Sequence, residues 1–180
     1  MTIQELQEKD KSFVESLFIS KINNIFVKLF TAIILDELKD VDHFINDDVY
    51  EYASNIIENA NSKNARQMYD ELNVKDSKIL TIEENTECYI INVLLNARYM
   101  DYLIDKESGK YISGNNKYRT EDDYYLTFTK SKNATTQNII KKCPGCGNSL
   151  SVNTSGVCPY CQSVYDQENH DWVLTSIKKR

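Results

Sequence analysis

Apolar side chains recur with a helical period along the first third of the chain. Ser12 followed by Glu15 is typical of a capping box, so the first helix is expected to begin there and to run to about Lys39. Its inward face holds apolar residues spaced mostly three or four positions apart: Phe13, Leu17, Ile22, Ile25, Phe26, Leu29, Phe30, Ile33 and Ile34. A second helix is predicted from about Asp47. The residues of its inward face are Tyr50, Ala53, Ile56, Ile57 and Ala60.

After Asn73 the pattern changes to an alternation of apolar and polar residues, which is typical of β-strands. Residues 65–72 (ARQMYDEL), just before this change, would extend the second helix or form a linker. Four strands are predicted, at residues 78–87, 88–105, 118–131 and 171–177. Because residues 108–117 contain Gly109 and Gly114, we expect them to form a hairpin connection.

This order of elements predicts an α+β fold. Two N-terminal helices would pack on one face of a four-stranded antiparallel sheet, since each element must bury its apolar side against the other layer. We expect the domain to span residues 12–180, preceded by an N-terminal tail at residues 1–11.

Composition and charge narrow the class of protein. The chain has 180 residues, 41% of them hydrophobic, and its net charge of −6 argues against nucleic-acid binding, because phosphate contacts need a concentrated basic surface. The most apolar stretch, residues 25–35, is shorter than the roughly 20 residues of a membrane-spanning helix, and residues 1–10 do not resemble a signal peptide. We therefore expect a cytoplasmic protein. Abundant Asn, Lys, Ile and Tyr suggest an AT-rich bacterial genome.

Two Cys-x-x-Cys pairs lie near the C-terminal end. Cys143 and Cys146 form the first pair, and Cys158 and Cys161 form the second. Four thiolates at this spacing can occupy the corners of a tetrahedron around a structural zinc ion, with no open coordination position. Disulfides or a redox pair are the alternatives, but the lack of an export signal and the Pro and Gly residues in the pairs favour zinc. We predict one Zn²⁺ in a ribbon at residues 141–166, inserted before the last strand.

Several segments together carry a resemblance to a known family. They are NDDVYEYASNIIENA (46–60), INVLLNARYMDYLIDKESGKYISG (91–114), YRTEDDYYLTFTKS (118–131) and WVLTSI (172–177). The chain resembles the Tim44-like domain family of the nuclear transport factor 2-like superfamily, whose cystatin-like fold packs helices on a curved sheet. Bacterial relatives with a zinc ribbon before the last strand are similar in layout. The resemblance implies a non-enzymatic binding or adaptor module linked to protein transport or membrane-associated assembly.

The resemblance also implies a concave pocket for a protein partner or an apolar ligand. Many bacterial relatives carry a membrane-spanning segment upstream. None is visible in this sequence, so contact with the inner face of the membrane would be peripheral. A third hypothesis is a structural domain whose ribbon mediates self-association.

Unbroken alternation in the second strand would place Tyr99 and Asp101 on the pocket side, and Tyr125 is a further aromatic candidate. Asp101 would then be a candidate general base, so a small-molecule-binding protein or an enzyme on the same fold is the alternative function. A bulge that turns Asp101 outward, or its pairing with Arg98 or Arg119, would remove that role.

Overall fold

The chain folds around one antiparallel sheet with the strand order β1-β2-β3-β6. The computed structural model describes residues 1–132, 141–142, 148–150, 160–161 and 172–180. Its elements in chain order are α1 (Ile3–Lys9), α2 (Glu15–Ile34), the 3₁₀-helix η1 (Asp42–Phe44), α3 (Asp47–Asn61), β1 (Ala65–Glu84), β2 (Cys88–Asp105), β3 (Tyr111–Ser131), β4 (Lys141–Lys142), β5 (Ser149–Leu150) and β6 (Trp172–Lys179). β4 and β5 form a separate two-stranded sheet.

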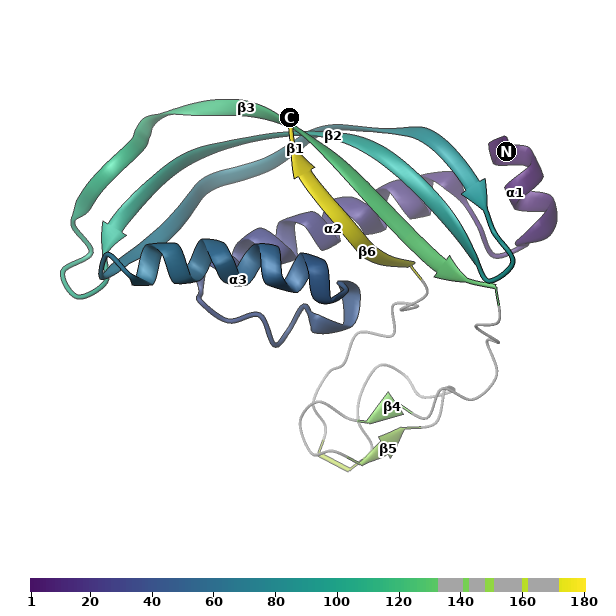
Figure 1. Ribbon diagram of the computed structural model, residues 1–180, viewed down its shortest axis with the longest axis horizontal. Helices are drawn as coiled ribbons and strands as arrows, with labels where there is room; N and C mark the ends of the chain where they lie inside the picture. The colour runs from purple at the N-terminus through teal and green to yellow at the C-terminus, as the bar shows by residue number, and fades with distance from the viewer. Residues whose placement is uncertain (133–140, 143–147, 151–159, 162–171) are drawn as a thin grey trace.

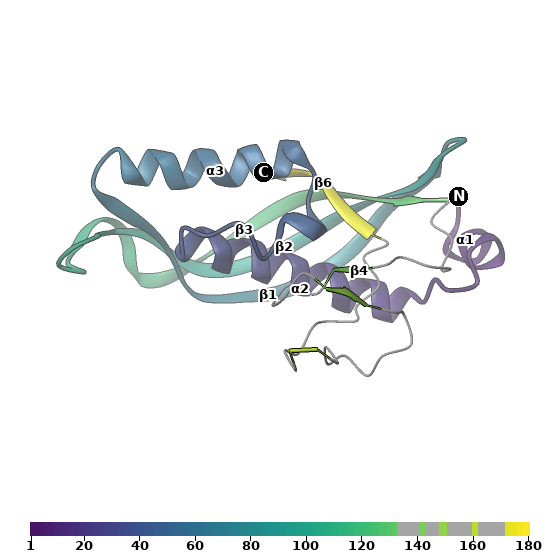
Figure 2. The ribbon, with the colours of Figure 1, turned by 90° about the horizontal axis from the view of Figure 1, so that it is seen from below.

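The long sheet is curved, and both α2 and α3 lie on its concave side (Figures 1 and 2). The described chain therefore has the α+β fold and the four-stranded antiparallel sheet that the sequence predicts, although it has three α-helices where two are expected. β6 pairs with β3 as the closing strand, in agreement with the predicted order.

Along β2 the side chains alternate between the buried, concave face of the sheet and its other face. From Tyr89 to Tyr99 every second side chain is buried, and the side chains between them are half-buried on the other face. α2 supplies the opposing surface, because its apolar residues recur with the helical period. The buried side chains of α2 are Phe18, Ile22, Ile25, Phe26, Leu29, Phe30, Ala32 and Ile33.

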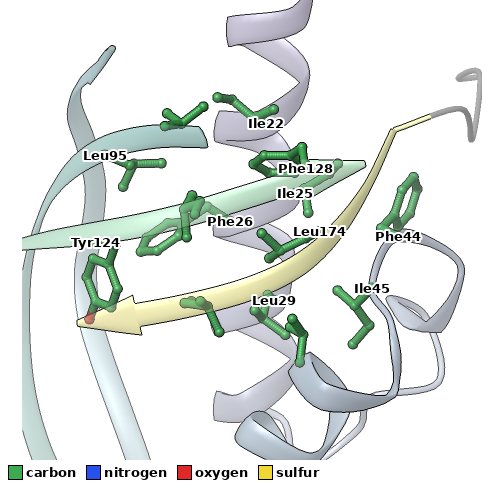
Figure 3. Packing of buried hydrophobic residues seen from close by; sticks show 14 of the residues in the cluster. Ile22, Ile25, Phe26, Leu29, Phe44, Ile45, Leu95, Tyr124, Phe128 and Leu174 are labelled. Carbon is green, nitrogen blue, oxygen red and sulfur yellow. The ribbon is translucent and has the colours of Figure 1, made fainter. Parts of the chain in front are cut away.

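Figure 3 shows how the two layers meet. The ring of Phe26 lies with its centroid 5.0 Å from that of Tyr124 on β3 and 4.4 Å from that of Phe30 on the same helix. Ile45, just after η1, forms a parallel bridge with Leu174 of β6 and extends the same apolar layer. Each fully buried side chain of this size contributes about 1.5–3 kcal/mol to the free energy of unfolding. The fold therefore depends on the apolar face of the helix lying against the apolar face of the strands.

Both ends of the first predicted helix differ from expectation. α2 begins at Glu15, and its N-cap, Val14, makes no side-chain capping bond. Ser12 instead donates its hydroxyl to the carboxylate of Asp10, 2.6 Å away. The helix ends at Ile34, not near Lys39, because Asp36 adopts a left-handed conformation (φ 56°).

The bonds that end α2 form a Schellman motif. The amide of Glu37 donates to the carbonyl of Ala32 (2.9 Å), and that of Asp36 donates to the carbonyl of Ile33 (3.1 Å). The left-handed residue is usually glycine, so no glycine in the sequence marks this helix end.

Residues 1–11, set apart as a tail in the sequence analysis, contain the helix α1. Thr2 and Glu5 form a capping box at its start, and Leu6 is fully buried in the common core. The capping box predicted for α2 is therefore found on the preceding helix.

Residues 65–72 form the beginning of β1 and are neither helix nor linker. The register of β1 as a whole against β2 shifts at three places, between Asp70 and Asn73, between Val74 and Asp76, and between Ile79 and Thr81. Each shift resets the face on which the next side chain lies, so no continuous alternation marks this strand in the sequence. β3 likewise begins earlier than predicted, at Tyr111.

By length and composition α2 is able to cross a membrane. The apolar stretch at residues 25–35 covers only the second half of this helix. A core helix of a soluble protein has the same composition, and the apolar face of α2 is buried against the sheet. Packing alone therefore explains its apolar character.

Two glycines at the β2–β3 connection offer a test of this geometry. At Gly114 (φ 103°) an added Cβ would lie 2.6 Å from the carbonyl oxygen of Asp101, whereas at Gly109 (φ 67°) it would meet nothing within 4 Å. Gly114→Ala should therefore lower the free energy of unfolding by about 3 kcal/mol, from strain and clash together, and Gly109→Ala by about 1 kcal/mol from strain alone. Urea denaturation measures both, and equal effects would contradict the close approach at Gly114.

Candidate functional site

A polar network lies within the otherwise apolar concave face, centred on Tyr99 of β2. Its hydroxyl donates to Oδ2 of Asp122 on β3 (2.6 Å) and also hydrogen-bonds the hydroxyl of Tyr124. Lys179 of β6 reaches the same Asp122 oxygen, at 2.8 Å, with its ammonium 5.6 Å from the centroid of the Tyr99 ring. The network therefore joins three neighbouring strands.

Burial and hydrogen bonding set the charge states in this network. Burial, and after it the hydrogen bonds with Asp122 and Tyr124, raises the pKa of Tyr99 far above its usual range, so this hydroxyl stays protonated. Burial opposes ionisation of Asp122, but the hydrogen bonds from Lys179 and Tyr99 outweigh it and lower its pKa. The result is a carboxylate held by an ammonium and a phenol.

Asp101 lies on the same concave side, two residues further along β2. It is paired in register with Tyr69 of β1, whose ring is buried, and residues directly opposite each other share a face. Nε2 of Gln67 donates to Oδ1 of Asp101 at 2.8 Å. Burial raises the pKa of Tyr52 and of Tyr69, and the negative charge of Asp101 raises both further.

Two of the alternatives for Asp101 can be compared with the structure directly. Arg98 pairs with Glu121, and Arg119 pairs with Glu71, so neither arginine forms an ion pair with Asp101. A register shift does occur beside Asp101, between β2 and β3, but its extra residues belong to β3. Asp101 therefore keeps its place opposite Tyr69.

Tyr125 does not join Tyr99 and Asp101. Its neighbour Tyr124 is the buried one, and Tyr125 itself pairs with Leu94 on the opposite face of the sheet and is 42% exposed. Tyr99 and Asp101 therefore share one side as predicted, whereas Tyr125 is not a pocket residue. It lies on the face of Thr127 and Thr129, opposite to Tyr124, Leu126 and Phe128.

Sequence reasoning missed several members of this cluster, namely Gln67, Asp122, Tyr124 and Lys179. Asp122 and Tyr124 are in alternation with the apolar Leu126 and Phe128, so the sequence places them on one face, but it does not indicate which partner bonds the carboxylate. Lys179 lies among the basic residues at the C-terminal end, where no local pattern marks it as part of a site. Only strand pairing brings it to Asp122.

Two open grooves lie at the other end of the sheet. One, of about 560 Å³, lies between α1 and the end of β1, where Glu5, Lys9 and Glu84 are among its lining residues. The other, of about 380 Å³, runs along β1 beside Ile3 and Ile19. Neither groove is lined by any of the three predicted pocket residues.

Of the predicted zinc ligands, Cys143, Cys146 and Cys158 lie outside the described residues. Cys161 is described and is exposed in a turn. Within the described part of the chain, no group of three or more His, Cys, Asp or Glu side chains is placed to hold a metal ion. Cys88, the remaining cysteine, is half-buried at the start of β2.

Comparison with known proteins agrees with this architecture. The family model of the Tim44-like domain matches residues 1–139, which is more than three quarters of the chain. The chain belongs to the Tim44-like domain family. Membership links it to protein transport, and Tim44-like domains in general bind proteins or membranes and are not catalytic. Among curated proteins nothing matches the chain significantly.

The match also bears on the organisation of the chain. It includes α1 and ends within the connection that follows β3, so the predicted ribbon and β6 lie beyond it. The helices and the first three strands of the sheet are therefore the part that this Tim44-like domain shares with its family.

Removing one hydroxyl tests the polar network. Tyr99→Phe should lower the free energy of unfolding by about 2 kcal/mol at pH 7, because Asp122 loses a donor and Tyr124 loses its partner. The control Tyr118→Phe, at a side chain that is 73% exposed, should change it by less than about 0.5 kcal/mol.

The loss of stability caused by Tyr99→Phe should depend on pH. Because the folded-state pKa of Asp122 is lowered, its stabilisation is present above the unfolded pKa of about 3.9 and is lost as the pH falls through the folded value. The difference between wild type and Tyr99→Phe should therefore shrink below about pH 4. Denaturation at several pH values measures it, and a pH-independent difference would argue against the charged pair.

Proposed function

We propose that this Tim44-like domain is a non-enzymatic adaptor that binds a protein partner in protein transport or membrane-associated assembly. The observation that carries this proposal is the filled concave face. Aromatic and aliphatic side chains of α2 occupy the space over β2 and β3, and the polar groups among them bond to one another. A face of this kind supports a rigid scaffold whose outer surfaces contact the partner.

The alternative is a small-molecule-binding protein or enzyme that uses Asp101. A specific observation favours it, because the carboxylate is close enough to raise the pKa of Tyr52, Tyr69 and Tyr124. Against it, Asp101 already accepts a hydrogen bond from Gln67, and both grooves described above lie elsewhere. A general base must reach the proton that it removes, so the adaptor is the better-supported function.

The proposed module includes a structural zinc ribbon. β4 ends at Lys142, immediately before Cys143, and β5 begins at Ser149, shortly after Cys146. The two strands pair in antiparallel fashion, and the first cysteine pair lies between them in the sequence. This placement supports a zinc knuckle. The zinc ion would be bound by Cys143, Cys146, Cys158 and Cys161, and would stabilise a connection too long to order easily without it.

Metal analysis tests the ribbon. The purified chain should contain about one zinc ion, and Cys143→Ser combined with Cys146→Ser should abolish binding, because two of the four thiolates are lost. The matched control Cys88→Ser should keep the metal. Elemental mass spectrometry gives the ratio. A chain without zinc, or equal loss in the control, would contradict the ribbon.

Crosslinking in cells tests the adaptor function. A tagged chain should crosslink to translocase or envelope proteins recovered in the membrane fraction, identified by mass spectrometry. Leu29→Asp is the control for non-specific capture, since a charge at this fully buried position should unfold the domain and leave only chaperones bound. Recovery in the soluble fraction alone, without a partner beyond those of the control, would overturn the proposal.

A further inference from the structure

The outer edge of β1 is an unpaired edge of the long sheet. β1 is the first strand in the order β1-β2-β3-β6, so within the described part of the chain no strand pairs with this edge. At the opposite edge of the sheet, the amide of Asn46 donates to the carbonyl of Leu174 on β6 (3.1 Å), and Ile45 forms a bridge with the same residue. An edge without such cover is able to accept a further strand, because its N–H and C=O groups are left to solvent.

The last residues of β1 direct main-chain groups outward. The amide of Asn85 donates to the carbonyl of Cys88 (3.0 Å), so these two residues form a hydrogen-bonded pair at the hairpin turn. Hydrogen-bonded and non-hydrogen-bonded pairs alternate along an antiparallel ladder, and Glu84 and Ile82 therefore point their N–H and C=O groups away from β2. The amino group of Met1 donates to the carbonyl of Ile82 (3.0 Å), which shows that this edge accepts an N–H donor.

The two grooves described above lie along this edge and adjoin each other. Groove A, of about 560 Å³, lies between α1 and residues Ile82, Glu83 and Glu84 of β1, at the end of the sheet beside α1 (Figure 1). Groove B, of about 380 Å³, continues along β1 from Ile82 to Ser77. Because Met1 and Ile82 line both grooves, the two follow the outer edge of β1 without interruption.

Groove B brings apolar side chains of three elements together. Ile3 of α1 and Ile19 of α2 are half-buried beside it. On β1, Ile79 is half-buried, and Leu80 is 44% exposed. Leu80 is the extra residue of a register shift, and a bulge of this kind limits the pairing of an added strand. We therefore expect regular pairing only at residues 81–84, with a side chain of the added strand entering groove B.

Groove A has an acidic lining. Four glutamates and one lysine line it, and the lysine, Lys9, pairs with Glu84 at exposed positions. Glu5, Glu8 and Glu83 form no ion pair within the described residues. An exposed ion pair such as that of Lys9 rearranges at little cost. The groove therefore attracts a cationic side chain and repels an anionic one.

We propose that the outer edge of β1 is the docking site for an extended segment of a protein partner, which joins the sheet as a fifth strand beside residues 81–84. Its main chain would pair with the outward groups of Glu84 and Ile82. An apolar side chain would enter groove B, and a cationic side chain would lie in groove A. Strand addition draws affinity from main-chain hydrogen bonds and specificity from side-chain pockets, and this edge offers both.

Other occupants fit this edge less well. A second copy of the chain would bring its own Glu83 and Glu84 to the same place, so like charges would oppose the pairing of two β1 edges. The same carboxylates repel an anionic ligand. A metal ion would need several ligands, and the described residues contain no group of three or more His, Cys, Asp or Glu side chains placed to hold one.

The inference rests on the adaptor function, since it names where and how the partner docks. Peptide binding to the purified full chain separates the two. Crosslinking in cells without binding of the peptide would keep the adaptor and remove the β1 site. Binding of the peptide without a crosslinked partner would keep the site and overturn the adaptor.

Fluorescence anisotropy with short labelled peptides tests the mode of docking. The probe is a fluorescein-labelled peptide in which valine and lysine alternate. It should bind at least about ten-fold more tightly than a peptide in which valine and glutamate alternate, because of the acidic lining. N-methylation of alternate residues of the probe should abolish binding, since it removes the N–H donors of a strand and keeps the side chains.

Variants of the chain test the place of docking. Glu8→Gln with Glu83→Gln should weaken binding of the valine–lysine peptide about five-fold, since exposed charges contribute modestly. The matched control Glu37→Gln with Glu51→Gln makes the same change in net charge at exposed positions outside both grooves and should have little effect. Equal losses in the two variants would show non-specific attraction and overturn the site.

Hydrogen exchange followed by NMR locates the added strand. The amide of Glu84 should exchange more slowly when the valine–lysine peptide is bound, because it becomes a donor to the new strand. Amides outside the two grooves should keep their rates. Absence of peptide binding, or protection elsewhere and not at Glu84, would each overturn the proposal.

Discussion

The packing of α2 against the concave face of the sheet is the constraint on which the rest of the structure depends. The helix has a period of 3.6 residues and each strand a period of two, and the core forms only where the two apolar surfaces meet. In this chain Phe26 of α2, Leu95 of β2 and Tyr124 of β3 lie where the two apolar surfaces meet (Figure 3). A shift of one residue in a strand would turn all of its side chains to the opposite face of the sheet. The contact with α2 therefore decides which side chains lie inside and which face the solvent.

The polar groups on the concave face follow from the same constraint. Once β2 places Tyr99 inside, its hydroxyl must find a partner there, since an unpaired buried polar group is costly. Asp122 supplies an acceptor, and Lys179 balances its charge from the last strand. The closing strand therefore contributes more than hydrogen bonds to the sheet edge, because it also carries the cation that pairs with the half-buried carboxylate of Asp122.

The two ends of the sheet differ in chemistry. At one end α1 covers the β1–β2 hairpin with Leu6 in the core and acidic side chains around a groove. At the other end the sheet extends past its helices into the β2–β3 connection, where side-chain hydrogen bonds of Asp105 and Asn115 hold the backbone.

The sequence by itself determined the fold class, the core face of α2 except for Leu17, which is exposed, the bounds of β2 and the common side of Tyr99 and Asp101, because period and alternation are short-range properties. It also carries the zinc ligand spacing, which remains a prediction. Tertiary structure alone decided that residues 65–72 are a strand and that Lys179 reaches Asp122. The physical reason is range: bulges, strand register and cross-strand ion pairs are set by residues far apart in the chain, and no local pattern encodes them.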